Sequence, residues 1–430
     1  MGKEKITNAN SFPKDWPIKK LADIGSTYGG LTNKSKEDFA EGNSKFITYK
    51  NIYNNTFINT NELESVRIYK DEKQNKVKYG DVFFTGSSET PDEVGISSVL
   101  LEEVDDVYLN SFCFGFRFND LKKTIPEFYG YYFRGPVFRN EVYPLAQGST
   151  RFNLSKSEMI KLKVPVPPVK EQYKIAAILS SVDEAIEKTE AIIEQTEKVK
   201  KGLMQQLLTK GIGHTKFKKT EIGEIPEQWE IRKLNQVSTR ITEKNKGKTD
   251  RVLTISGLHG LVSQTEYFNK SVASKNIDGY YYLRKGDFAY NKSYSDGYPL
   301  GAIKMLERYP DGVVSTLYIC FRINENMCKD YFRYYFESNL WNSEVSAIAP
   351  EGGRSHGLLN VGVNDFFNIF IPIPPIEEQY KISSIIRSVE NKEKLELEKL
   401  EKLKTIKMGL MQVLLTGKVR VKVEDEVMSQ

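Results

Sequence analysis

Polar loops rich in glycine, serine, asparagine and basic residues recur at matching places in the two halves of the chain. Residues 85–88 follow a strand-like apolar run, as residues 290–295 do, and residues 148–153 correspond to residues 352–356. Glycine lets backbone amides approach phosphates, while Arg, Lys, Asn and Ser side chains can bond phosphates and base edges. Turn chemistry alone is the alternative explanation for any single loop, but the repetition favours nucleic-acid contact. From these loops and residues 48–52, the DNA-binding candidates are Lys50, Ser87, Ser88 and Arg151 in the first half, and Asn291, Lys292, Arg354 and His356 in the second.

The sequence contains no recognisable catalytic or metal-binding motif. A phosphate loop, a Gly-x-Gly-x-x-Gly start after a strand and a Gly-x-Ser-x-Gly elbow are all missing. The three histidines lie far apart, and none stands in a metal-ligand spacing. Three cysteines without a C-x-x-C pair cannot build a disulfide framework. The residues therefore predict no catalytic site and no metal site in this chain.

Composition narrows the class of protein further. The 430 residues carry 62 Lys and Arg against 57 Asp and Glu, a formal charge of +5 that is compatible with nucleic acid but does not demonstrate it. No run of 18 apolar residues is present, and no apolar stretch follows the first charged residues as in a secretory signal. We expect a soluble, cytoplasmic protein that does not contact membranes.

The chain is an internal repeat. Residues 165–209 align without a gap with residues 372–416, at an offset of 207, and 20 of the 45 positions are identical. Weaker echoes precede each segment in the same order, for example Asp81 with Asp287 and Arg117 with Arg322. The repeat predicts two divergent mixed domains, each followed by a long helix that the two halves share closely.

These elements predict an α+β fold with two mixed domains and two long helices. The expected divisions are a first head at 1–164, a first spacer helix at 165–211, a second head at 212–371, a second spacer helix at 372–418 and a tail at 419–430. Proline pairs suit the first turn of each helix. A helix of about 40 residues spans roughly 60 Å. Because one narrow apolar stripe cannot be buried alone, we expect the helices to pair as an antiparallel coiled coil.

The seam of that coiled coil follows steps of three and four residues. Gly202 and Gly409 lie inside the helices, where they either allow two backbones to approach closely or mark a helix end. The predicted seam residues are Ile175, Ile178, Val182, Ala185, Thr189, Ile192, Thr196, Val199 and Leu203 in the first helix, and Ile382, Ile385, Val389, Leu400, Leu403, Ile406 and Leu410 in the second.

Through these repeated segments the chain resembles the specificity subunit of type I restriction–modification systems. The resemblance rests on Pro-x-Pro-Pro-x-x-Glu-Gln at residues 165–172 and 372–379, and on Gly-Leu-Met-Gln-x-Leu-Leu-Thr at residues 202–209 and 409–416. The Pro…Trp…Leu starts of both heads are also similar to that family. The similarity covers essentially the whole chain.

The resemblance implies a DNA-recognition protein without its own active site. Each head would be a target recognition domain that reads one half of a split double-stranded site. The helices would dock methyltransferase (modification) subunits, usually two, and restriction subunits would join them. S-adenosylmethionine, ATP and Mg²⁺ would bind those partners and not this chain. The residues that the resemblance assigns to docking and to the spacer are Glu171, Gln172, Tyr173, Gly202, Leu203, Glu378, Gln379, Tyr380, Gly409 and Leu410.

Because the heads diverge, we expect an asymmetric site with half-sites roughly 10 bp apart, centre to centre. Three alternatives stay open at this point: a stand-alone bipartite DNA-binding protein, a specificity subunit of another restriction–modification type, and a coiled-coil scaffold with protein-binding heads. Strong salt dependence of DNA binding would favour the DNA-binding functions over the scaffold.

Overall fold

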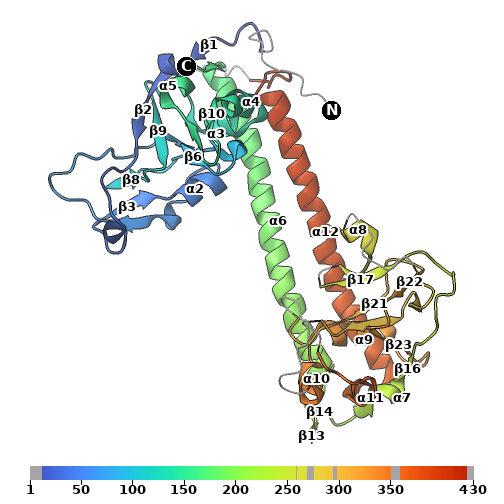
Figure 1. The fold of residues 1–430 in the computed structure, drawn as a ribbon. Coiled ribbons are helices and arrows are strands. Elements are labelled where there is room, and N and C mark those ends of the chain that lie inside the picture. Colours follow the sequence, from blue (N-terminus) through green and yellow to red (C-terminus); the bar gives the residue numbers. More distant parts are fainter. Residues whose placement is uncertain (1–11, 258, 269–275, 294–297, 350–358, 424–430) are drawn as a thin grey trace, which may run out of the picture. The chain divides into compact units, whose positions relative to one another are not determined.

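The computed structural model describes residues 12–257, 259–268, 276–293, 298–349 and 359–423. Its contacts divide the chain into two compact units, Met1–Glu190 with Glu398–Gln430 and Ala191–Leu397. The division crosses both long helices, α6 (Val169–Lys210) and α12 (Ile376–Leu414), so each unit contains part of both (Figure 1). The repeat of a mixed head and a long helix is therefore confirmed.

The first unit places short helices around several small sheets. Strand order β2-β9-β5-β7 forms its four-stranded antiparallel sheet, β4-β3-β8 and β10-β11-β6 form three-stranded sheets, and β1 pairs with β12. The strands are β1 (Ile18–Lys20), β2 (Gly25–Gly29), β3 (Ser44–Ile47), β4 (Glu64–Val66), β5 (Val82–Thr85), β6 (Ser87–Ser88), β7 (Ser97–Val99), β8 (Val107–Leu109), β9 (Cys113–Phe118), β10 (Ala146–Gln147), β11 (Phe152–Leu154) and β12 (Lys163–Pro165). The helices are α1 (Leu21–Ile24), η2 (Lys36–Phe39), α2 (Tyr49–Asn54), η3 (Thr60–Glu62), η4 (Pro91–Glu93), α3 (Pro126–Arg134), α4 (Pro136–Val142), η5 (Tyr143–Leu145) and α5 (Lys156–Met159).

The second unit repeats the central part of this plan. Its four-stranded sheet has the order β16-β23-β20-β21, and β15 pairs with β24 as β1 pairs with β12. The strands are β13 (Phe217–Thr220), β14 (Gly223–Pro226), β15 (Glu230–Lys233), β16 (Ser238–Arg240), β17 (Leu253–Ser256), β18 (Gly260–Ser263), β19 (Tyr281–Arg284), β20 (Phe288–Asn291), β21 (Ala302–Met305), β22 (Asp311–Val314), β23 (Ile319–Ile323) and β24 (Phe370–Ile373). The helices are α7 (Leu234–Val237), α8 (Gln264–Phe268), α9 (Lys329–Glu337), α10 (Asn342–Ile348) and α11 (Val363–Phe367).

An aromatic helix packs on the four-stranded sheet in each unit. In the first unit, the rings of Phe84 on β5 and Phe133 on α3 lie 5.3 Å apart, and both are fully buried. In the second unit, Phe288 on β20 and Phe336 on α9 lie 5.8 Å apart in the same edge-on arrangement. Burial of one such ring stabilises the fold by roughly 1.5–3 kcal/mol, so these clusters are the main cores of the two heads.

The repeated aspartate–arginine pair explains two of the weaker sequence echoes. Asp81 follows a tight turn before β5, is fully buried, and accepts hydrogen bonds from Arg117 Nε at 2.7 Å and Nη2 at 2.6 Å. Asp287 accepts the same two bonds from Arg322, at 2.6 and 2.7 Å. These residues therefore fix a turn against the central strand in each sheet.

Each long helix begins directly after its proline pair. The carbonyls of Pro168 and Pro375 accept the first backbone bonds of α6 and α12. Within the first unit, Asp183 and Glu190 of α6 form ion pairs with Lys407 and Lys404 of α12, respectively. Residue numbers rise along one helix as they fall along the other, so the two segments run antiparallel.

The predicted seam is wrong at four positions, which are exposed, and its other residues are buried or partly buried. Thr189 and Thr196 are buried, but Ile192 and Val199 are exposed, and Ile193 is buried instead. An α-helix has 3.6 residues per turn, so a strict 3.5-residue seam drifts by about 20° per heptad. On α12 the same correction applies to Ile385 and Ile406, which are exposed, whereas Ile382 and Leu400 are buried.

The helix-end interpretation of the two glycines is wrong, and no close backbone neighbour lies in the described part of the chain. A Cβ atom placed on Gly202 or Gly409 would meet no described atom within 4 Å. The helices also continue past them, to Lys210 and Leu414.

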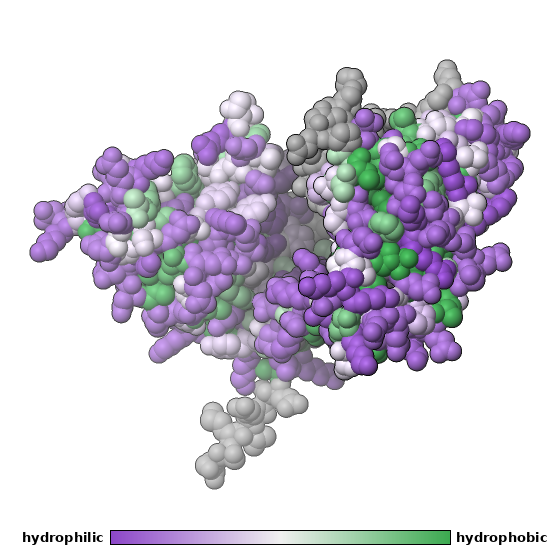
Figure 2. All heavy atoms as spheres, turned by 90° about the horizontal axis from the view of Figure 1, so that it is seen from below, coloured by the Kyte–Doolittle hydropathy of each residue, from purple (hydrophilic) through white to green (hydrophobic). Residues whose placement is uncertain are grey.

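The surface matches the low mean hydropathy of −0.47. On the face that Figure 2 shows, hydrophilic residues predominate and hydrophobic ones form small patches. No helix in the described parts of the chain is long and apolar enough to cross a membrane.

Candidate nucleic-acid interface

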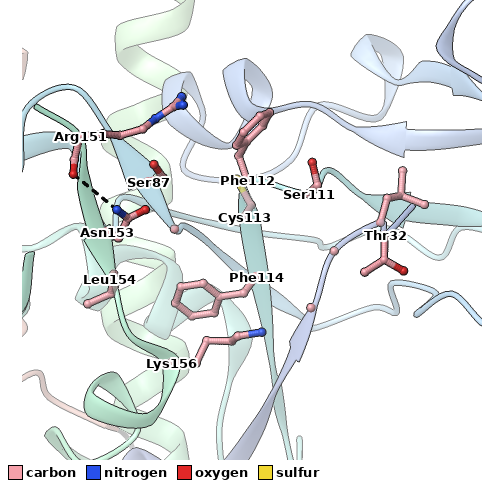
Figure 3. A pocket seen from close by; sticks show the side chains of 14 residues that line it. Thr32, Ser87, Ser111, Phe112, Cys113, Phe114, Arg151, Asn153, Leu154 and Lys156 are labelled. Atoms are coloured by element: carbon pink, nitrogen blue, oxygen red, sulfur yellow. Dashed lines mark hydrogen bonds between the residues drawn. The ribbon is translucent and has the colours of Figure 1, made fainter. Parts of the chain in front are cut away.

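Loops from four parts of the first head surround a hollow of about 460 Å³ (Figure 3). They are the end of β2, the β5–β6 link, the β8–β9 turn and the β10–β11 hairpin with the start of α5. We call this the first hollow. The residues that line it are Gly29, Gly30, Leu31, Thr32, Gly86, Ser87, Ser111, Phe112, Cys113, Phe114, Arg151, Asn153, Leu154 and Lys156.

The hairpin places Arg151 at the rim of this hollow. Strand β11 pairs with β6, with Asn153 opposite Ser87, and β10 pairs with β11 on its other side. The connecting turn needs glycine at position 148, because its φ is +145° and a Cβ there would lie 2.0 Å from the Arg151 carbonyl oxygen. The glycine predicted as a phosphate-contacting residue therefore has a structural reason of its own.

The β8–β9 turn presents an exposed aromatic ring on a fixed backbone. Asn110 is buried; its Oδ1 accepts the Phe112 N–H at 3.0 Å, and its Nδ2 donates to the Ile47 carbonyl at 3.1 Å. The Gly86 N–H donates to the Phe112 carbonyl at 2.9 Å. The backbone of Phe112 is thus held from both sides, while its side chain is 56% exposed.

Arg151 and Phe112 form a ridge. The guanidinium carbon of Arg151 lies 5.4 Å from the centre of the Phe112 ring, within the range of a cation–π contact. Among the described residues, no carboxylate forms an ion pair with Arg151. Its N–H donors therefore remain available to a ligand.

A second hollow, of about 280 Å³, lies on the other side of this ridge. Tyr49, Ser87, Ser88, Glu89, Glu93, Phe112 and Arg151 line it. The Ser88 hydroxyl donates to Glu93 Oε2 at 2.5 Å, which lowers the pKa of the Glu93 carboxyl. This hollow therefore carries a fixed negative charge and acceptor oxygens, whereas the first hollow carries Lys156.

Three of the four candidates in the first head come together here. Ser87 and Arg151 line both hollows, and Ser88 lines the second, although its hydroxyl is already bonded to Glu93. Lys50 is exposed on α2 but lines neither hollow; Tyr49 beside it lines the second. Their contact with DNA stays a prediction.

Sequence reasoning missed Phe112 and Lys156. An aromatic residue between two buried strands looks like a core residue, and only the preceding Asn-Ser turn signal could have suggested otherwise. Cys113 beside it is inert, because burial raises the pKa of its thiol to about 12.

The equivalent surface of the second head is partly described. Asn291 ends β20, and its Oδ1 accepts the Ser293 N–H at 3.1 Å, whereas Lys292 Nζ reaches the Val361 carbonyl at 3.4 Å. Arg354 and His356 lie outside the described residues. The turn before β23 again carries an exposed apolar residue, Leu317, whose side chain is 61% exposed.

The residues assigned to docking fall into two groups. Gln172 and Gln379 are buried and bond within their own units, while Glu171 and Glu378 bind the segments that follow the other long helix. Glu171 pairs with Arg420, and Glu378 accepts from Trp229 Nε1 at 3.0 Å and lies 2.9 Å from His214 Nε2.

The remaining docking candidates are more accessible. Tyr173 and Tyr380 are 57% and 58% exposed. Leu203 and Leu410 are partly buried against the cores of their units, and Gly202 and Gly409 face open space. A docking role for any of these residues stays a prediction.

Comparison with known proteins gives matches over both halves of the chain. A family model for the type I restriction modification DNA specificity domain matches the chain twice, at residues 13–198 and 217–408. The MjaVIII specificity subunit of a type I restriction enzyme from Methanocaldococcus jannaschii is 30% identical over 285 residues, which are 63% of this chain and 65% of that protein.

Solved structures have the same fold. The S subunit of the type I restriction–modification system from M. genitalium has a TM-score of 0.53 at 15% identity, covering 98% of this chain and 99% of that one. A structure that addresses complex assembly and conformational transition of the type I R-M system has a TM-score of 0.58 at 15% identity, covering 95% and 99%.

Proposed function

Because the chain belongs to the type I restriction–modification specificity subunits, a family that recognises DNA sequence, we propose that it reads a bipartite, asymmetric DNA site. Each head would recognise one half-site. The chain itself would perform no chemistry. S-adenosylmethionine, ATP and Mg²⁺ would be held by methyltransferase and restriction subunits that dock on it, and the complex would act on DNA in the cytoplasm.

The observation that carries this proposal is that the two heads share one scaffold but present different residues on their candidate contact surfaces. The aspartate–arginine pair and the aromatic helix recur in both heads. Residues at equivalent loops differ: Phe112 in the first head corresponds to Leu317 in the second, and the loop with Ser87 and Ser88 corresponds to the loop with Asn291 and Lys292. Two copies of one reader with different contact residues would read two different half-sites, so the full site would not be a palindrome.

Docking of methyltransferase subunits is supported by the exposed positions on the long helices. A glycine inside a helix costs about 1 kcal/mol relative to alanine, and no described residue of the chain approaches Gly202 or Gly409 closely. Close approach of a partner's backbone would explain why glycine stands at both positions. Two equivalent surfaces would then accept two methyltransferase subunits.

The test is co-expression with the neighbouring methyltransferase subunit in a host free of adenine methylation, followed by genome-wide mapping of N6-methyladenine. A split, asymmetric motif with a methylated adenine in each half is the expected result. A continuous or palindromic motif would contradict the two-reader proposal. A stable complex that adds no methylation would contradict the proposed activity.

A further inference from the structure

Both heads expose an apolar residue at the same turn. The paired arginines Arg117 and Arg322 fix the correspondence between β9 and β23. Five residues before each arginine stands Phe112 in the first head and Leu317 in the second. These are the most exposed large hydrophobic side chains among the described residues of their heads, at 56% and 61%. A single exposed apolar residue is ordinary, but its repetition at an equivalent position in divergent heads is not.

The two turns are also built alike. In the first, Asn110 Oδ1 accepts the Phe112 N–H at 3.0 Å; in the second, Ser315 Oγ accepts the Leu317 N–H at 3.4 Å. The residue that follows each tip donates its N–H to the carbonyl of the same Asn or Ser, from Cys113 at 3.4 Å and from Tyr318 at 3.1 Å. Each apolar side chain is therefore presented on a closed turn.

The surroundings of Phe112 indicate what it contacts. Its ring and Arg151 stand between two hollows, one lined by Lys156 and several glycines and the other by Ser88 and Glu93. A ridge between recesses fits a DNA groove, and Arg151 and Lys156 complement its negative charge. The apolar group on the major-groove floor is the thymine methyl, and an arginine fork matches guanine O6 and N7.

Resting on the proposed function, we infer that Phe112 and Leu317 are equivalent specificity-determining residues, each contacting a thymine methyl group in the major groove of its own half-site. In the first head, Arg151, stacked on Phe112, reads a guanine next to that thymine. In the second head, Leu317 makes the corresponding apolar contact.

The first test uses the wild-type specificity subunit in complex with its methyltransferase subunit, on duplexes of the mapped site. Each thymine is replaced in turn by deoxyuridine, which removes only the methyl group. One substitution in each half-site should weaken binding about fourfold, the worth of one buried methyl group. Replacing the adjacent guanine by 7-deazaguanine in the first head's half-site should weaken binding about tenfold.

The second test assigns the effect to residues. With F112A, the deoxyuridine effect should vanish in the first head's half-site and persist in the other; L317A should give the reverse. L121A is the matched control, because Leu121 is an exposed apolar residue of the first head that lines neither hollow. It should leave both effects unchanged.

The outcomes separate this inference from the proposed function. If the wild-type complex does not prefer the mapped site over a scrambled one, the proposed function fails. If it does prefer that site, but deoxyuridine has no effect or F112A keeps the methyl effect, this inference is overturned. Methyl-independent unstacking of a base step, seen with 2-aminopurine, would make Phe112 a wedge and also overturn it.

Discussion

Gln172 Oε1 accepts the backbone N–H of Ile125 at 2.8 Å, which ties the start of α3 to the first turn of α6. The Gln172 amide nitrogen donates to the carbonyls of Pro167 at 2.7 Å and Lys123 at 2.9 Å. Gln379 makes the matching bonds in the second unit, to Cys328 N–H at 3.0 Å and the Pro374 carbonyl at 2.8 Å. The repeated glutamine therefore ties each head to the helix that follows it.

Replacing Gln172 by leucine should destabilise the first unit by about 2–3 kcal/mol, because it leaves buried backbone groups without partners. Hydrogen exchange resolved by unit measures this, with faster exchange expected at the Ile125 amide. The exposed neighbour gives a control: Tyr173→Ala should change the free energy of unfolding by less than about 0.5 kcal/mol. Equal effects of the two substitutions would contradict the role assigned to Gln172.

Substituting Asp81 by alanine should cost the first unit about 3 kcal/mol. The change leaves Arg117 without its carboxylate and frees the Tyr28 hydroxyl, which donates to Asp81 Oδ2 at 2.6 Å. Asp287→Ala should likewise destabilise the second unit and leave the first unaffected. Urea unfolding with hydrogen exchange in each unit distinguishes the two variants. If either variant destabilised both units, the aspartate–arginine pair would not act within its own unit alone.

The architecture was predictable because the sequence contains an internal repeat. Offsets of 207 along the helices place Gln172 and Gln379 at equivalent sites, and the Asp81 and Arg117 echoes mark the central sheet. The role of the Glu-Gln motif was not predictable, because a repeated motif can contact either a partner protein or other residues of the same chain. Burial of Gln172 shows the internal contact.

The contact surface was only partly predictable. Glycine, serine and arginine in the 148–151 turn gave a chemical signal, and Arg151 does lie at the rim of a hollow. Phe112 gave none, because Phe114 and Phe116, two and four residues further on, are buried strand residues of the same type. Which phenylalanine faces solvent depends on the β8–β9 turn, whose position depends on pairing between distant strands.

Acid should weaken the second unit through Glu390. Burial alone would raise the pKa of its carboxyl, but hydrogen bonds and charge from Arg333 outweigh burial, and the net pKa is lowered. A lowered folded-state pKa adds stability above the unfolded value of about 4.3, and this stability is lost as pH falls through the folded value. Urea midpoints of the second unit should therefore drop below about pH 4.3. Glu390→Gln should flatten this dependence, and an unchanged pH profile would exclude Glu390 as its source.

Arg151 should contribute to DNA binding through one half-site only. Arg151→Ala should weaken binding to the intact site about tenfold, within the range for a lost base contact, and should have almost no effect once the first head's half-site is scrambled. Fluorescence anisotropy on intact and half-scrambled duplexes, at two salt concentrations, measures this. Arg67→Ala is the matched control, because Arg67 is exposed in the same head, carries the same charge and lines neither hollow. Equal weakening on every duplex, with a smaller salt slope, would instead make Arg151 a phosphate contact, because counterion release does not depend on sequence.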